Sequence, residues 1–230
     1  MRAVDVMTTS VIFATPEMSV RDAAGMLANH SISAMPVTDA NGQLIGIISE
    51  GDLLHRSELG TGVRRRAWWL QFLASTRELA SEYVKEHGRT VEDVMTTEVI
   101  SVDEDTPLAE VAELLERHRI KRVPVLKGGK VTGVVSRANL VRALASIPLD
   151  SAPSSEPGDE MLRDAILAAM AGERWALVRG QVIVTHGVAH LWGVISSEEE
   201  RKAICIATKN VPGVKEVVSH LDYPAVIPAM

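Results

Sequence analysis

Apolar side chains fall on one face of a helix at two places in the chain. The spacing i, i+3, i+4, i+7 is met by Val20, Ala23, Ala24 and Leu27, and again by Leu108, Val111, Ala112 and Leu115. A stripe of this kind predicts an amphipathic helix. Ser19 is the predicted N-cap of the first helix, with Asp22 completing a capping box. Thr106 is the predicted N-cap of the second helix, with Pro107 at its first helical position.

Short β-type runs surround each predicted helix. Residues 11–13 precede the first helix and residues 99–100 precede the second. After each helix two predicted strands flank a tight turn: 35–37 and 44–48 about Asn41-Gly42, then 123–126 and 131–135 about Gly128-Gly129. A second short helix ends each set. A sheet with helices on one face cannot bury its other face alone, so we expect an α/β (α+β) fold in which the two halves pack through their sheets.

The two halves are copies of one unit. Asp-Val-Met-Thr-Thr at residues 5–9 recurs letter for letter at residues 93–97. The copies occupy residues 1–56 and 90–146. Residues 57–89 are an insertion, which is predicted as one amphipathic helix carrying Trp68 and Trp69.

A different pattern follows the second copy. Residues 147–158 are rich in Pro, Ser and Gly and are predicted to be a linker. Residues 159–223 are then predicted to form a small α-β-β-α-β domain. Its elements are a helix at 160–171, a hairpin of 181–185 and 189–195 across His186-Gly187, a helix at 197–209 and a strand at 214–221.

Composition narrows the class of protein. The chain is 46% hydrophobic with a net charge of −6, which is typical of a globular protein and argues against a nucleic-acid partner. Cys205 is the single cysteine, so an internal disulfide and a cysteine-based metal site are excluded. With no signal-peptide pattern and no long apolar run, we expect a cytoplasmic protein. No nucleophile–base pair or paired-carboxylate signature is evident, so we expect no enzymatic activity and no metal.

Residues 1–146 resemble a tandem CBS-domain pair, or Bateman module. The resemblance rests on the repeated Asp-Val-Met-Thr-Thr, on Met-Pro-Val at 35–37 and Val-Pro-Val at 123–125, and on Gly-Ile-Ile-Ser-Glu-Gly-Asp at 46–52. The last 75 or so residues resemble a BON domain, on the glycine and apolar spacing around Gly187, Gly193 and Pro212-Gly213.

The resemblance implies an adenine nucleotide (AMP, ADP or ATP) as a regulatory ligand between the repeats. In the family, a Gly-apolar-apolar-Ser/Thr-x-x-Asp segment holds the ribose through its Asp and lies near phosphate through its Ser or Thr. The first copy matches this pattern fully. The implied ligand-binding residues are Ile47, Ser49, Asp52, Met95, Ile100, Lys121 and Arg122, with the two cations facing phosphate and the apolar residues lining an adenine pocket.

The second copy departs from the pattern, because Asn139 stands where the family has Asp. An amide has no charge and one acceptor oxygen, so it should hold a ribose less well. The implied weaker second site consists of Ile12, Ser33, Ala34, Ser136 and Asn139. We therefore expect one strong ligand site for each chain.

Plainer interpretations stand beside these. Ser49-x-x-Asp52 is also an ordinary capping box. The basic run at residues 117–122 is also typical of a solvated helix end, where cations complement the dipole. Arg-Arg-Arg-Ala-Trp-Trp at residues 64–69 favours salt bridges between domains or subunits over nucleic-acid binding. His186 and His190 flank the hairpin without an evident carboxylate partner, so they are not assigned a metal.

Two functions from different classes follow. The first is a homodimeric adenine-nucleotide sensor whose BON domain signals to an unidentified protein or lipid partner. The second is a constitutive dimeric scaffold that the BON domain tethers to a lipid or envelope surface. Residues 153–230 hold seven Lys or Arg against ten Asp or Glu, which is a poor fit to an anionic leaflet.

Overall fold

The computed structural model describes residues 1–54, 83–84, 87–147 and 157–224. Trp68, Trp69 and the arginine run before them lie outside the described residues, as does nearly all of the predicted linker. The chain divides into two compact units. Unit 1 contains Met1–Ser10, Ser101–Lys127 and Thr132–Met230, and unit 2 contains Val11–Ile100 and Gly128–Val131. Both units combine helices and strands, so the α+β class is confirmed.

Unit 2 contains the first repeat. Its elements are α2 (Val20–Asn29), β1 (Ala34–Thr38), β2 (Leu44–Ser49), α3 (Glu50–Leu53) and α6 (Val91–Val94). Ser19 caps α2 by accepting a hydrogen bond from the Asp22 amide at 3.1 Å, as predicted. The strands β1 and β2 pair antiparallel across a turn that Gly42 permits with a φ of 77°. The buried side chains of these elements form one core: Ala14, Val20, Ala23, Leu27, Met35, Val37, Ile48, Val91 and Val94.

The strand predicted at residues 11–13 is wrong in position. Ala14 alone makes a parallel bridge, to Val37 of β1. The Ala14 amide donates to Pro36 at 3.0 Å, and the Ala14 carbonyl accepts from Thr38 at 3.2 Å. Ala14 is fully buried, whereas Phe13 is 38% exposed. The apolar residues 11–13 therefore lead up to the sheet, and the residue that pairs with β1 is the next one, Ala14.

Unit 1 contains most of the second repeat, together with the first ten residues of the chain. Its elements are α1 (Ala3–Val6), β3 (Val102–Asp103), α7 (Leu108–Arg117), β4 (Arg122–Lys127), β5 (Lys130–Ser136, which begins in unit 2) and α8 (Arg137–Ala145). The sheet order is β3-β4-β5, with β3 parallel to β4. The strand predicted at 99–100 is thus found a few residues later, at β3. The paired residue of the first repeat, Ala14, also lies after its predicted strand.

The predicted cap of α7 is also wrong, by one residue. Pro107 occupies the N-cap position, because the Thr106 hydroxyl accepts a hydrogen bond from the Asp103 amide at 3.1 Å. Thr106 therefore holds the loop before the helix. An apolar stripe locates a helix better than it locates the first residue of that helix.

The repeated Asp-Val-Met-Thr-Thr motif is exchanged between the two repeats. Thr8, from the first copy, pairs with Val134 of β5 through two 3.0 Å hydrogen bonds within unit 1. Thr96, from the second copy, pairs with Ile47 of β2 through two 2.9 Å bonds within unit 2. Each repeat therefore completes its sheet with a motif that belongs, in sequence, to the other.

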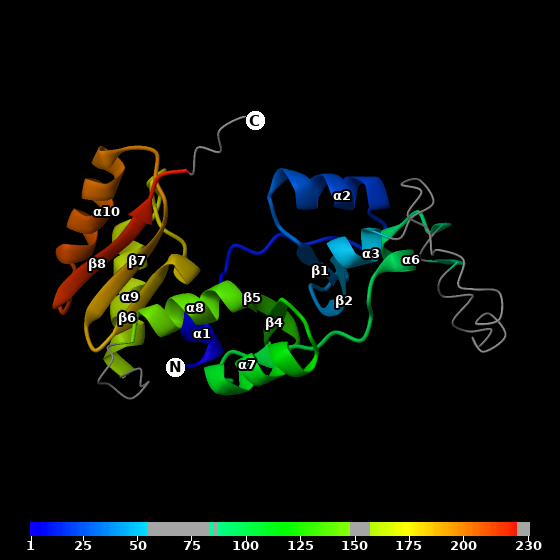
Figure 1. Cartoon of the computed structure of the whole chain (residues 1–230), viewed down its shortest axis with the longest axis horizontal. Coiled ribbons are helices and arrows are strands. Elements are labelled where there is room, and N and C mark those ends of the chain that lie inside the picture. The colour runs from blue at the N-terminus through cyan, green and yellow to red at the C-terminus, as the bar shows by residue number, and fades with distance from the viewer. Residues whose placement is uncertain (55–82, 85–86, 148–156, 225–230) are drawn as a thin grey trace. The chain divides into compact units, whose positions relative to one another are not determined.

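The C-terminal part of unit 1 is the predicted α-β-β-α-β domain (Figure 1). It contains α9 (Pro157–Ala169), η2 (Arg179–Gln181), β6 (Val182–Thr185), β7 (Val188–Val194), α10 (Glu198–Lys209) and β8 (Glu216–Asp222). The sheet order is β6-β7-β8, with β7 parallel to β8. The two helices cover one face of this sheet, where Ile166, Met170 and Ile204 join the strand residues in a single core.

A buried carboxylate fixes the β6–β7 turn. His186 and Gly187 both have positive φ, at 54° and 81°. Their amides donate to Asp159 of α9 at 2.8 and 2.9 Å. Within the described part of the chain, no helix combines the length and apolar character needed to cross a membrane.

Candidate functional site

Asp52 lies where β2 ends and α3 begins. Its Oδ2 accepts hydrogen bonds from the Ser49 amide at 3.0 Å and from the Ser49 hydroxyl at 2.7 Å. Ser49 and Asp52 therefore form the predicted capping box. The capping box uses only Oδ2 of Asp52, and the Asp52 side chain is half-buried.

The exchanged motif brings Thr96 to that other oxygen. The Thr96 hydroxyl donates to Asp52 Oδ1 at 3.2 Å, which is long for a hydrogen bond between two oxygens. A ligand hydroxyl could replace this bond at small cost, because Thr96 can rotate its proton to another acceptor. One charged group and two hydroxyls, those of Ser49 and Thr96, therefore gather at the end of β2.

An apolar wall stands beside these polar groups. Met95 lies so close to Gly46 that a Cβ at that position would meet the Met95 sulfur. Ile47 is half-buried, and its backbone is paired to Thr96. Ile100 is half-buried in the same unit. Ile47, Ser49, Asp52 and Met95 are thus brought together around Thr96, and the cluster offers a carboxylate next to apolar surface.

Asn139 occupies the equivalent position in unit 1. Its Oδ1 accepts from the Ser136 amide at 2.9 Å and the Ser136 hydroxyl at 2.6 Å. Its Nδ2 donates to the Val6 carbonyl at 2.8 Å and to Thr8 Oγ1 at 3.4 Å. These four bonds use the full capacity of an amide side chain. Asn139 is only 3% exposed, whereas Asp52 is half-buried.

The remaining predicted residues are divided between the units. Ile12, Ser33 and Ala34 lie in unit 2, where Ile12 packs against the core and the Ser33 carbonyl accepts from the Glu50 amide at 3.0 Å. Lys121 is exposed and Arg122 is half-buried at the start of β4, and both belong to unit 1. Their predicted role toward Asp52 stays a prediction.

Sequence reasoning missed Thr96 and its counterpart Thr8. The Thr96 hydroxyl contacts Asp52 of the first copy, and the Thr8 hydroxyl contacts Asn139 of the second copy. A signal was present, because Asp-Val-Met-Thr-Thr recurs without a change while the residues directly before and after it differ. Identical letters in two diverged copies indicate a shared contact.

A histidine pair lies on the C-terminal sheet. His190 Nδ1 and His220 Nε2 are 3.2 Å apart, and His220 stacks on Trp192 with 3.8 Å between ring centroids. Burial lowers the pKa of both imidazoles, and the charge of His220 lowers the pKa of His190 further. His186 is not part of this pair. Among the described residues, no three His, Cys, Asp or Glu side chains are grouped so as to hold a metal.

Comparison with known proteins reveals two kinds of domain. Models of the CBS domain match residues 3–58 and 91–146, and a model of the BON domain matches residues 158–225. The CBS domain-containing protein CBSX2, chloroplastic, of Arabidopsis thaliana is 31% identical over 145 residues, which is 61% of this chain and 61% of that protein. The crystal structure of CBSX2 in complex with AMP is similar with a TM-score of 0.56 at 33% identity, covering 64% of this chain and 97% of that chain.

A further match is to an enzyme. L-aspartate semialdehyde sulfurtransferase of Methanocaldococcus jannaschii is 26% identical over 139 residues, which is 60% of this chain but only 22% of the enzyme. The chain also spans less than two thirds of CBSX2 itself, at 61% of its length.

Proposed function

Because this chain belongs to the CBS-domain family and has a BON domain after its two CBS repeats, we propose that it is a regulatory protein that binds an adenosine-containing ligand at Asp52. The observation that carries the proposal is the meeting of Asp52, Ser49 and Thr96 beside Met95 and Ile47. A carboxylate accepts hydrogen bonds from two adjacent hydroxyls, which is the chemistry of a ribose diol. The AMP complex of CBSX2 supports the class of ligand.

Each residue of the site has a proposed role. Asp52 accepts the two ribose hydroxyls, with one of them replacing the long bond from Thr96. Ser49 keeps Asp52 in place through its two bonds to Oδ2, and the Thr96 hydroxyl turns toward the ligand. Met95, Ile47 and Ile100 contact the apolar faces of the adenine ring, whose burial favours binding. Lys121 and Arg122 supply the phosphate contacts that the family resemblance implies.

The proposed activity is binding and not catalysis. CBS repeats account for the match to CBSX2, and the match to the sulfurtransferase covers a minor part of that enzyme. We propose that the ligand changes the state of the CBS pair and that the BON domain passes this change to a protein partner in the cytoplasm. A ligand can shift such an equilibrium only by its different affinity for the two states.

We also propose that the protein acts as a homodimer. The helix α8 exposes two large apolar side chains, Val141 at 65% and Leu144 at 72%. The helices α2 and α3 border a hollow of about 570 Å³ with a largely apolar lining that includes Leu27, Leu53 and Leu54. Exposed apolar side chains and an apolar hollow of this kind favour association.

The site is tested by Asp52→Asn. The second repeat already has asparagine here, and Asn139 keeps the same capping bonds, so this variant is expected to fold. Loss of a hydrogen-bond acceptor with full charge costs about 1.5–3 kcal/mol, so the affinity for AMP should fall roughly 10- to 100-fold. Isothermal titration calorimetry with AMP and ATP measures the change.

Asp22→Asn is the matched control. Asp22 completes the same kind of capping box, with Ser19, on an exposed part of the same unit. Its substitution should leave the affinity for AMP unchanged. Absence of heat with AMP and with ATP on the wild-type protein would contradict the sensor and favour the scaffold.

A further inference from the structure

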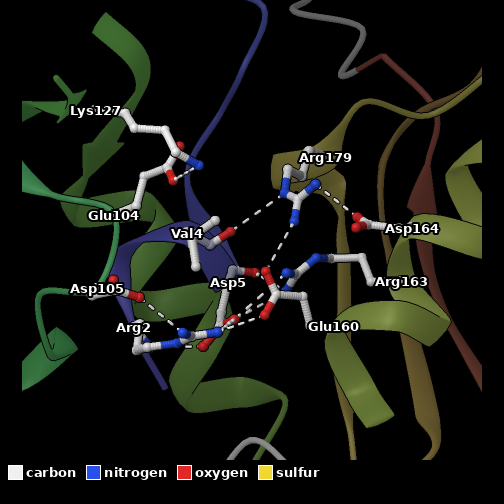
Figure 2. Close-up of polar contacts among 10 residues, drawn as sticks. All are labelled: Arg2, Val4, Asp5, Glu104, Asp105, Lys127, Glu160, Arg163, Asp164 and Arg179. Atoms are coloured by element: carbon white, nitrogen blue, oxygen red, sulfur yellow. Dashed lines mark hydrogen bonds and ion pairs between the residues drawn. The ribbon is translucent and has the colours of Figure 1, made fainter. Parts of the chain in front are cut away.

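The BON domain is anchored on the short segment that completes the second repeat, residues 3–8, called here the site segment. Arg163 of α9 donates from Nη1 to the Asp5 carbonyl at 2.8 Å, and its guanidinium lies 3.5 Å from Asp5 Oδ1 (Figure 2). Both side chains are only 2% exposed. A buried ion pair contributes little net stability, but loss of one partner leaves an uncompensated charge. The pair therefore fixes where the BON domain sits on the site segment.

Outer polar contacts surround this pair. Arg179 donates from Nε to the Val4 carbonyl at 3.4 Å and from Nη1 to Asp164 at 2.7 Å. Arg2 donates from Nη2 to Glu160 of α9 at 2.6 Å (Figure 2). The charges of Arg2 and Arg179 thus join the first turn of α1 to α9 and η2. Being partly exposed, these contacts orient the domain more than they stabilise it.

At Gly180 the backbone of the BON domain lies close against the site segment. A Cβ at Gly180 would lie 2.7 Å from Thr8 Oγ1 and 3.2 Å from the Met7 carbonyl oxygen. A side chain at this position would require Thr8 or Met7 to shift, so glycine permits the contact as it stands. The BON backbone therefore lies directly against the threonine that contacts Asn139.

The site segment and Asn139 depend on each other. Asn139 gives both of its N–H groups to the segment, at the Val6 carbonyl and at Thr8 Oγ1. A ligand hydroxyl could reach the Asn139 amide only by displacing one of these bonds. The bond to Thr8 is the longer of the two, so Thr8 would have to give way, but Gly180 lies against Thr8 on its other side and Arg163 holds Asp5.

We propose that the docked BON domain keeps the Asn139 position closed, and that its release opens this position as a second adenine-nucleotide site. The inference rests on the proposed function, since it needs a ligand that CBS repeats bind. Coupling between two sites is reciprocal, so a nucleotide bound at Asn139 would favour release of the BON domain. The BON domain would thereby be freed at nucleotide concentrations above those that fill the Asp52 site.

The experiment compares the full chain with Gly180→Ala, which should push the BON domain off Thr8. Calorimetry with AMP is expected to give about one nucleotide bound for each wild-type chain and about two for the variant, because a larger fraction of the variant is competent to bind. Hydrogen exchange at the amides of residues 3–8 reports undocking, and it should rise in the variant. Gly158→Ala is the control, since a Cβ at Gly158 has nothing within 4 Å.

A second variant guards against misfolding. Arg163→Met keeps an unbranched side chain but removes the guanidinium that bonds Asp5, and it should also expose a second nucleotide site. If either variant shows faster exchange at residues 3–8 but still binds one nucleotide, the BON domain does not close the Asn139 position. The proposed Asp52 site would be unaffected by that result. Two nucleotides on the wild-type chain, with residues 3–8 protected, would overturn the closure as well. No binding by any form would overturn both the closure and the sensor.

Discussion

One residue type decides the difference between the two copies at the same backbone position. Asp52 and Asn139 each accept two hydrogen bonds from a serine that precedes a helix. The carboxylate has no proton to donate, so it attracts the Thr96 hydroxyl and stays half-buried. The amide has two protons, so it can bond the Val6 carbonyl and close the position. The single change from acid to amide thus accompanies the change from a half-buried position to a fully buried one.

Asn139→Ala tests the structural role. It leaves the buried Val6 carbonyl and the Ser136 amide without partners, which costs about 1–3 kcal/mol. Urea unfolding of the full chain should register this loss as a lower midpoint. Asn41 is an exposed asparagine in a turn, and Asn41→Ala should have a much smaller effect. Equal effects of the two substitutions would contradict the role given to Asn139.

At the scale of elements, local signals located the helices and strands well. Stripes, capping boxes and glycine turns act over a few residues, so the sequence predicted α2, β1, β2, α9 and α10 nearly as they are. The misplaced first strands and the cap at Thr106 have one cause. Where a bridge or loop contact joins distant residues, as Ala14 joins Val37, the local pattern holds no information about the partner.

The N-cap of α10 gives a testable prediction for a single element. Ser197 caps α10 by accepting from the Glu200 amide at 3.1 Å, ahead of three glutamates in the first turn. Ser197→Ala should lower the free energy of unfolding by about 1 kcal/mol, since an orphan amide loses its acceptor. Chemical denaturation measures the change. Ser197→Asn should restore most of the stability, and failure of this rescue would argue against capping as the cause.

At the scale of the whole molecule, the exchanged motifs and the docked BON domain were beyond sequence reasoning. Arg163 lies on the same helical stripe as Ile166 and Met170, so its burial could have been foreseen. Its partner Asp5 could not, because 158 residues separate the two in the chain. A separation of 131 residues hid Thr8 from Asn139 in the same way. The repeat supplied the parts of the Asp52 site, and only the fold showed which copy of the motif serves which repeat.

The stability of the molecule should depend on pH through His190 and His220. Burial lowers the pKa of both in the folded state, so between that pKa and the unfolded value of about 6.5 the unfolded chain binds more protons. Stability is therefore full above about pH 6.5 and declines as the pH falls below it. The charge of Glu216 opposes this decline at His190 without reversing it.

Urea unfolding at pH 7.5 and 5.5 measures the decline. His190→Gln with His220→Gln should reduce the difference between the two pH values. His30 is exposed at the end of α2, and His30→Gln serves as the control. An unchanged difference in the double variant would contradict the assignment to this histidine pair.

The exchanged motifs also have a consequence for biosynthesis. Residues 3–8 are synthesised before their partners β5, Asn139, Arg163 and Gly180. At roughly 5–20 residues per second, this segment waits about 10–35 s for Gly180. Throughout that delay Val4, Val6 and Met7 are without their final burial. A nascent chain of this protein therefore offers a short apolar segment to chaperones until Gly180 has emerged.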